Sequence, residues 1–141
     1  AVCLGISAQS SDEVIRLLGE RLIALGKVKA DYPDALIARE STMPTGLPLG
    51  TINVAVPHSD PVHVVAPAIG LATLKEPVSF ASMDDPEEKL PVRVVIALAL
   101  TDKDAQIEML QAVARFIQNP GALAALAKAR TPEEAFSAFP T

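Results

Sequence analysis

Apolar residues recur at helical spacing over residues 10–26. Ser10 and Glu13 stand three positions apart, the spacing of a capping box, and Gly26 provides a stop signal. The apolar positions of this stretch are Val14, Leu17, Leu18, Leu22 and Leu25. This pattern predicts the first helix of the chain.

A second, shorter helix is predicted over residues 31–41. Pro33 falls in its first turn, where a missing N–H costs nothing, and Arg39 and Glu40 fall in its last turn. A third helix starts at Asp102 or Asp104 and runs to about residue 118, before an Asn-Pro-Gly break. Two short helices, over residues 122–128 and 132–139, are predicted to follow it.

Four strands are predicted between these helices, over residues 52–56, 68–74, 78–80 and 92–100. The last of them is apolar at nearly every position, which is typical of a central strand covered on both faces. Residues 44–50 form a turn-rich segment, residues 61–67 a loop or short extended piece, and residues 84–89 an acidic turn. The pattern indicates one layered α/β domain, residues 1–141, with its strands in the middle.

Composition excludes several classes of function. The apolar run at residues 92–100 is far shorter than the roughly 20 residues of a membrane span, so we expect no membrane insertion. A net charge of −5 without any dense Lys/Arg cluster argues against nucleic acid as a partner. The single Cys3 cannot form an internal disulfide, which agrees with a reducing compartment. We expect a cytoplasmic protein.

The strand at residues 52–56 leads directly into Pro57 and His58. Proline fixes its own φ and lacks an N–H, so Pro57 is predicted to end the sheet ladder and leave His58 at a rigid strand terminus. One of only two histidines in the chain therefore stands where a reactive imidazole is useful. The alternative is a histidine that only caps a turn.

Other kinds of site fit the residues poorly. His58 and His63 are separated by five positions on a non-helical stretch containing Pro61, and Cys3 is remote, so we expect no metal site. The chain has no Gly-x-Ser-x-Gly elbow, Walker loop or dinucleotide fingerprint, and we expect no cofactor.

The remaining chemistry is that of a histidine that carries a phosphoryl group. A neutral imidazole is nucleophilic near pH 7, and a guanidinium such as that of Arg39 binds phosphate in a fork. Arg39 is alternatively a solvated residue that interacts with the helix dipole. His63 either contacts the phosphoryl group or lies in a surface loop, and Thr45 either offers its hydroxyl or shapes the turn.

These residues resemble the enzyme IIA domains of the fructose/mannitol superfamily in the bacterial phosphoenolpyruvate-dependent sugar phosphotransferase system. The galactitol-type branch is the most similar, through residues 35–40, Pro57-His58 with Val62-His63 just beyond, and Gln106 in the following helix. The matching pieces are Ala38-Arg39-Glu40, Pro44-Thr45-Gly46-Leu47, Val54-Ala55-Val56-Pro57-His58 and Val94-Val95-Ile96-Ala97-Leu98.

The resemblance implies a mixed sheet flanked by helices on both faces. It also implies that His58 accepts a phosphoryl group on Nε2 from phospho-HPr and passes it to a cysteine of an enzyme IIB, which serves a membrane IIC subunit. Related domains often have a second histidine where Gln106 stands, so the auxiliary role is assigned to His63. Glu40 either orients Arg39 or sits on the helix surface. A regulatory module, which controls a kinase, transporter or transcription factor through the phosphorylation of His58, is the alternative function.

Overall fold

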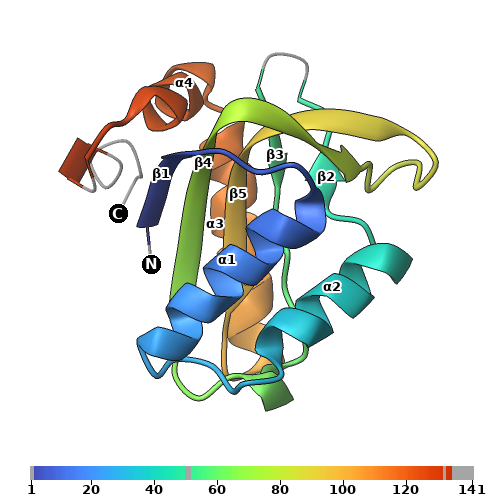
Figure 1. Ribbon diagram of the computed structural model, residues 1–141, viewed down its shortest axis with the longest axis vertical. Helices are drawn as coiled ribbons and strands as arrows, with labels where there is room; N and C mark the ends of the chain where they lie inside the picture. The colour runs from blue at the N-terminus through green and yellow to red at the C-terminus, as the bar shows by residue number, and fades with distance from the viewer. Residues whose placement is uncertain (1, 50–51, 132, 135–141) are drawn as a thin grey trace.

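A five-stranded mixed β-sheet forms the centre of the computed structural model, which describes residues 2–49, 52–131 and 133–134 (Figure 1). In spatial order the strands are β1 (Val2–Ile6), β4 (Ala68–Ala81), β5 (Lys89–Ala99), β3 (Asn53–Ala55) and β2 (Gly46–Leu47). Pairing is parallel between β1 and β4 and between β3 and β5, and antiparallel between β4 and β5 and between β2 and β3. The predicted α/β class is confirmed.

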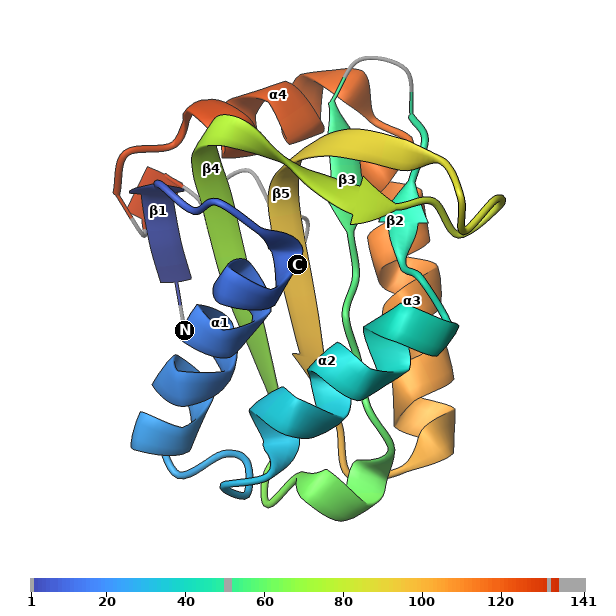
Figure 2. The same cartoon turned by 45° about the vertical axis from the view of Figure 1, so that its right-hand side comes forward.

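Helices cover both faces of this sheet, as Figures 1 and 2 show from two directions. One face carries α1 (Ser11–Ala24) and α2 (Tyr32–Thr42), and the other carries α3 (Lys103–Ile117) and α4 (Pro120–Lys128). The Ser10 side chain accepts a hydrogen bond from the Glu13 N–H, so the predicted N-cap of α1 is confirmed.

The middle strand, β5, joins two apolar cores. Val95, Ala97 and Ala99 pack toward α1 and α2, while Val94, Ile96 and Leu98 pack toward α3 and α4. Alternate side chains of one strand point to opposite faces, so an uninterrupted apolar run is needed wherever both faces are covered. The prediction of a central strand from this run is confirmed. Among the described residues, no helix has the length and apolar character needed to span a membrane.

Several boundaries differ from the prediction. β1 and β2 were not predicted, and the two predicted strands at 68–74 and 78–80 are one strand, β4, with a register shift between Thr73 and Val78. Polar Lys75 and Glu76 interrupt the apolar pattern, but the hairpin with β5 continues beyond them. β1 is short and partly exposed, and its pairing with β4 defines it. Residues 61–63 form a short 3-10 helix, η1 (Pro61–His63). The predicted helix over 132–139 lies mostly outside the described residues.

Gly19 allows α1 and α2 to approach closely. A Cβ atom added at position 19 would lie only 2.6 Å from Cγ of Pro33 at the start of α2. Alanine favours an exposed helix over glycine by about 1 kcal/mol, but overpacking costs about 1–3 kcal/mol. We therefore expect Gly19→Ala to lower the free energy of unfolding by about 1 kcal/mol in urea denaturation.

Gly121→Ala in α4 is the matched control for this prediction. An added Cβ there would make only an ordinary contact of 3.5 Å with Asn119 Oδ1. This variant should keep or slightly raise the free energy of unfolding. A Gly19→Ala protein at least as stable as the wild type would contradict the tight contact between α1 and α2.

Candidate functional site

The backbone at His58 remains attached to the central strand. The Leu98 N–H donates to the Pro57 carbonyl at 2.9 Å, and His58 pairs with Leu98 as a parallel bridge. The Leu98 carbonyl accepts from the buried Tyr32 hydroxyl at 2.7 Å. Pro57 therefore does not end all sheet pairing, because its carbonyl still accepts although it has no N–H to donate. The result is a fixed backbone beneath the imidazole of His58.

The imidazole of His58 is partly buried and has a defined hydrogen bond. Its Nδ1 lies 2.9 Å from the Val56 carbonyl oxygen. A carbonyl only accepts, so Nδ1 must carry the proton, and in the neutral ring Nε2 then holds the lone pair. Nε2 is therefore the nucleophilic nitrogen of the neutral His58 ring.

The surroundings favour the neutral form of this ring. Burial lowers the pKa of His58 below its usual 6.5, and the Arg39 cation lowers it further. The Val56 hydrogen bond and the Asp60 carboxylate raise the pKa of His58, but together they do not outweigh burial and Arg39. At pH 7 the imidazole is consequently uncharged and available as a nucleophile.

Arg39 lies close to His58 and is only partly solvated, with 30% of its side chain exposed. Its Nη1 lies 3.2 Å from Oδ1 of Asp60, two residues beyond the histidine. The Arg39 Nε is buried and has no hydrogen-bond partner among the described residues. The guanidinium beside the imidazole thus keeps one N–H, on its buried side, that no described residue accepts. The sequence pattern does not single out Asp60, because an acidic residue before a proline is also typical of a solvated loop.

The structure places His63 against the connection between α1 and α2. Its Nδ1 lies 3.1 Å from Oδ2 of Asp31, and its backbone carbonyl accepts from the Lys29 N–H at 2.9 Å. The neighbouring charges that shift the pKa of His58 are those of Arg39 and Asp60. The structure therefore brings Arg39 and His58 together, whereas His63 Nδ1 lies near Asp31, in a geometry that gives no hydrogen bond.

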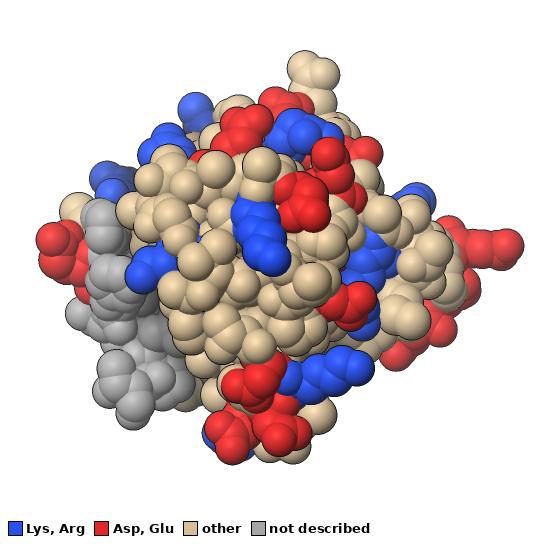
Figure 3. Space-filling model, turned by 90° about the horizontal axis from the view of Figure 1, so that it is seen from below, with Lys and Arg blue, Asp and Glu red and all other residues tan. Residues whose placement is uncertain are grey.

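The end of the molecule that carries η1 and the start of α3 exposes apolar side chains. Val62, Val65 and Ile107 are each more than half exposed. Figure 3, which views this end from below, shows uncharged side chains over much of the face, with a basic and an acidic side chain near its centre and further charged ones around the edge. Gln106, in the first turn of α3, buries its amide oxygen without a hydrogen-bond partner among the described residues. Exposed apolar side chains of this kind are typical of surfaces that contact other proteins.

Thr45 and Glu40 are buried near Val56, the residue that follows β3, and do not lie on the surface. The Thr45 N–H and hydroxyl both donate to the Glu40 carboxylate, at 2.9 to 3.0 Å. Glu40 is 8% exposed, so the expectation that it either orients Arg39 or sits on the helix surface is wrong: its carboxylate holds Thr45 instead. Burial raises the pKa of Glu40, although its bonds from Thr45 oppose the shift. The Thr45 hydroxyl is thus already committed to a buried contact.

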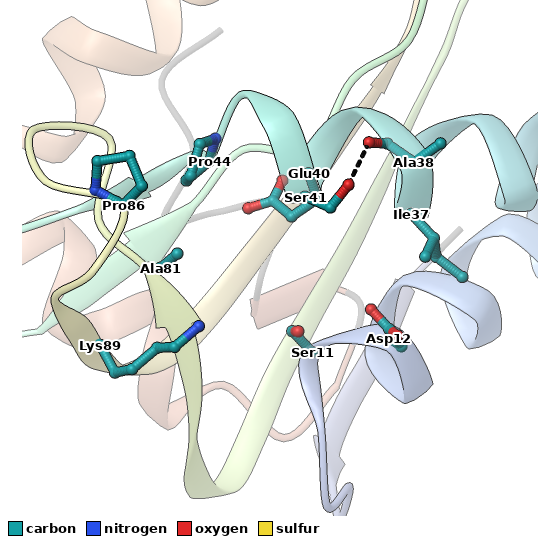
Figure 4. A pocket seen from close by; sticks show the side chains of 10 residues that line it. All are labelled: Ser11, Asp12, Ile37, Ala38, Glu40, Ser41, Pro44, Ala81, Pro86 and Lys89. Atoms are coloured by element: carbon teal, nitrogen blue, oxygen red, sulfur yellow. Dashed lines mark hydrogen bonds between the residues drawn. The ribbon is translucent and has the colours of Figure 1, made fainter.

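A cavity of about 390 Å³ opens beside Glu40 (Figure 4). Asp12, Ser41 and Lys89 also line it, together with apolar groups such as Ile37 and Pro44. Neither His58 nor Arg39 is among its lining residues. The cavity is therefore separate from the imidazole. Among the described residues, no group of three or more His, Cys, Asp or Glu side chains is arranged to hold a metal ion.

The surroundings of His58 predict its titration. We expect an NMR titration of the His58 Cε1–H signal to give a pKa below 6.5, since burial and Arg39 disfavour the imidazolium. Arg39→Gln should raise this pKa, because it removes the nearby positive charge. The depressed pKa also means that this group stabilises the fold above pH 6.5, and that the contribution is lost as the pH falls through the folded-state pKa. A value at or above 6.5 would contradict the partly buried position of the ring.

Comparison with protein families gives one model that matches residues 1–140. Its description is "Phosphoenolpyruvate-dependent sugar phosphotransferase system, EIIA 2". The match spans all the elements described above and includes the strand, the proline and the histidine of the candidate site.

Individual relatives agree with this family. The chain is 34% identical to the galactitol-specific EIIA component of Escherichia coli over 116 residues, 82% of this chain and 77% of that one. It is also 34% identical, over 99% of its length, to 21% of the 2-O-alpha-mannosyl-D-glycerate-specific EIIABC component of Escherichia coli. A solved complex of enzyme IIA Mtl with phosphorylated enzyme IIB Mtl from Escherichia coli shares the fold, with a TM-score of 0.81, 23% identity, and coverage of 98% of this chain and 92% of that one.

Proposed function

Because the chain belongs to the EIIA 2 family of the phosphoenolpyruvate-dependent sugar phosphotransferase system, we propose that His58 is the residue that carries the phosphoryl group. The observation that carries this proposal is the hydrogen bond from His58 Nδ1 to the Val56 carbonyl, which leaves the lone pair on Nε2. The chain is a phosphotransferase component related to the galactitol-type branch. We place its work in the cytoplasm.

The proposed reaction consists of two transfers. Nε2 of His58 attacks the phosphorus of phospho-HPr, and the bond between phosphorus and HPr breaks with its electron pair left on HPr. A cysteine thiolate of an enzyme IIB then attacks the same phosphorus, and the electron pair of the N–P bond returns to Nε2. Both steps need mainly alignment of the reacting atoms and a cation for the charge on the phosphoryl oxygens.

Arg39 is the proposed cation for both transfers. Its guanidinium lies near the ring and keeps a buried Nε–H without a partner among the described residues. Asp60 holds Nη1 of the same side chain and so limits its rotamers. His63 remains a predicted auxiliary ligand of the phosphoryl group, through Nε2, since its Nδ1 faces Asp31. The Thr45 hydroxyl, which is bonded to Glu40, affects the site indirectly.

The proposed partners are HPr as donor and an enzyme IIB as acceptor, with a membrane IIC subunit served indirectly. One relative is an EIIABC component, and a protein of the same fold was solved with phosphorylated enzyme IIB. The exposed Val62, Val65 and Ile107 are proposed to take part in docking both partners, because exposed apolar side chains are typical of protein–protein contacts. The transported sugar is not assigned, because two relatives of equal identity carry the names of different substrates.

Phosphorylation with purified components tests this function. The protein is incubated with phosphoenolpyruvate, enzyme I and HPr, and its intact mass is measured before and after acid treatment. We expect one acid-labile phosphoryl group per chain, which then moves to a cognate enzyme IIB. Absence of the added mass would overturn the proposal. A phosphorylated protein that passes its group to no enzyme IIB encoded nearby would favour the regulatory module instead.

A further inference from the structure

We propose that Glu40 and Thr45 are positioning residues that keep the His58 lone pair on Nε2, acting through the backbone of Val56. The inference rests on the proposed function, since it concerns the nitrogen that receives the phosphoryl group. Neither side chain touches the imidazole. Their effect passes along a continuous series of hydrogen bonds from α2 to the end of β3.

The first step is the orientation of the Thr45 hydroxyl. Its oxygen lies 3.0 Å and 2.9 Å from the two oxygens of Glu40, and a carboxylate only accepts, so the hydroxyl proton points to Glu40. The oxygen lone pairs must then point away from the carboxylate. One of them accepts from the Val56 N–H at 3.2 Å. Glu40 therefore sets the direction in which the hydroxyl can accept.

The second step is the position of Val56. Its N–H is shared between the Thr45 hydroxyl at 3.2 Å and the Thr45 carbonyl at 3.3 Å. Its carbonyl accepts from His58 Nδ1 at 2.9 Å. These bonds fix the peptide plane that precedes Val56, and Pro57 restricts Val56 itself to an extended backbone, so the carbonyl stays directed at the ring.

The third step is the choice of tautomer. A neutral imidazole carries its proton on either nitrogen, and the hydrogen bond of one nitrogen decides the state of the other. If the Val56 carbonyl turns away, the proton can move to Nε2, which then has no lone pair to attack phosphorus. The contacts of Thr45 thus favour the reactive form of His58.

A purely structural role for Glu40 explains these contacts less well. The carboxylate is buried at the wall of the cavity in Figure 4, and burial disfavours its charged form. A neutral side chain would connect α2 to Thr45 with a smaller desolvation penalty. The charged group, however, gives the stronger acceptor and fixes the hydroxyl proton more firmly.

Three variants test the inference, with two readouts. Thr45→Val removes the hydroxyl and should slow phosphorylation by phospho-HPr on the order of tenfold, whereas Thr45→Ser keeps the hydroxyl and should stay within about twofold of wild type. Glu40→Gln keeps one acceptor oxygen but loses the charge, so an intermediate rate is expected. Long-range 1H–15N spectra at pH 8 should show the Nδ1–H tautomer in wild type and Thr45→Ser, and a rise of the Nε2–H tautomer in Thr45→Val.

Ile15→Val is the matched control, since Ile15 is fully buried in α1 and makes none of these hydrogen bonds. It should lower the urea midpoint but leave the rate and the tautomer unchanged. An unchanged tautomer in Thr45→Val, or an equal loss of rate in Ile15→Val, would overturn the inference. If Thr45→Val does not fold, the same spectra are recorded for Glu40→Gln. An unchanged His58 tautomer in that variant would then overturn the inference. Wild type that shows the Nδ1–H tautomer but accepts no phosphoryl group would defeat the proposed function alone.

Discussion

Replacing His58 with glutamine is expected to abolish phosphorylation completely. Glutamine keeps a polar side chain of similar length, but its amide nitrogen has no lone pair that can attack phosphorus. In the wild type this lone pair sits on Nε2, because Nδ1 donates to Val56. Intact-mass measurement after incubation with phosphoenolpyruvate, enzyme I and HPr should show the added group on wild type and nothing on His58→Gln.

His63→Gln separates the two histidines of the chain. Because His63 is proposed only as an auxiliary ligand, this variant should still take up one phosphoryl group, and the decrease in its rate measures that auxiliary role. The turn-cap alternative for His58 makes the opposite prediction. Under it, His58→Gln would lose on the order of 1 kcal/mol of stability in urea and would still accept the group. That outcome would remove the carrier function.

Substitution of Arg39 is expected to have the second-largest effect. Arg39→Gln removes the cation beside the ring and should slow transfer to His58 by about 100-fold, the usual effect of losing one donor to a developing anion. Arg39→Lys keeps the charge but loses the fork of parallel N–H groups, so a smaller loss of about tenfold is expected. Rates are measured by rapid quench at several concentrations of phospho-HPr, so that binding and transfer are separated.

Arg16→Gln provides a matched control for this experiment. Arg16 also pairs with a carboxylate at 3.2 Å, that of Asp34, but its side chain is half exposed and the pair joins α1 to α2. The charge change is the same, and the rate should remain that of the wild type. An equal loss in both variants would indicate a general effect of net charge on docking with HPr. The local role of Arg39 would then be wrong.

Local signals were sufficient for most elements of the fold. The capping box at Ser10, the position of Pro33 in α2 and the unbroken apolar run of β5 each depend on neighbours along the chain. β1 and β2 have no comparable local signal, because a strand of five residues or of two is defined by the strand it pairs with. For the same reason, the sequence predicts two strands at 68–74 and 78–80 where the structure has the single strand β4.

In the candidate site, too, some features are recognisable from the sequence and others only from the structure. The sequence indicated the proposed nucleophile and its proposed cation, because a histidine after a proline at a strand end and an arginine at a helix end can be recognised from residue type and position. It did not reveal Asp60 as the partner of Arg39, nor the buried pairing of Glu40 with Thr45. Glutamate is rarely buried, so its position in the sequence favoured the surface. No pattern along the chain indicates that two side chains from α2 and the following turn hold Val56.

The sequence by itself determined the class of the fold and the choice of His58 and Arg39 as the proposed reacting groups, because periodicity, caps and residue chemistry are local properties. Only the tertiary structure decided which nitrogen of His58 carries the lone pair, that Asp60 pairs with Arg39, and that the His63 ring lies near Asp31. Each of these depends on distances between segments that lie far apart along the chain. Hydrogen-bond direction and burial are set by those distances, and the reactivity of the imidazole follows from them.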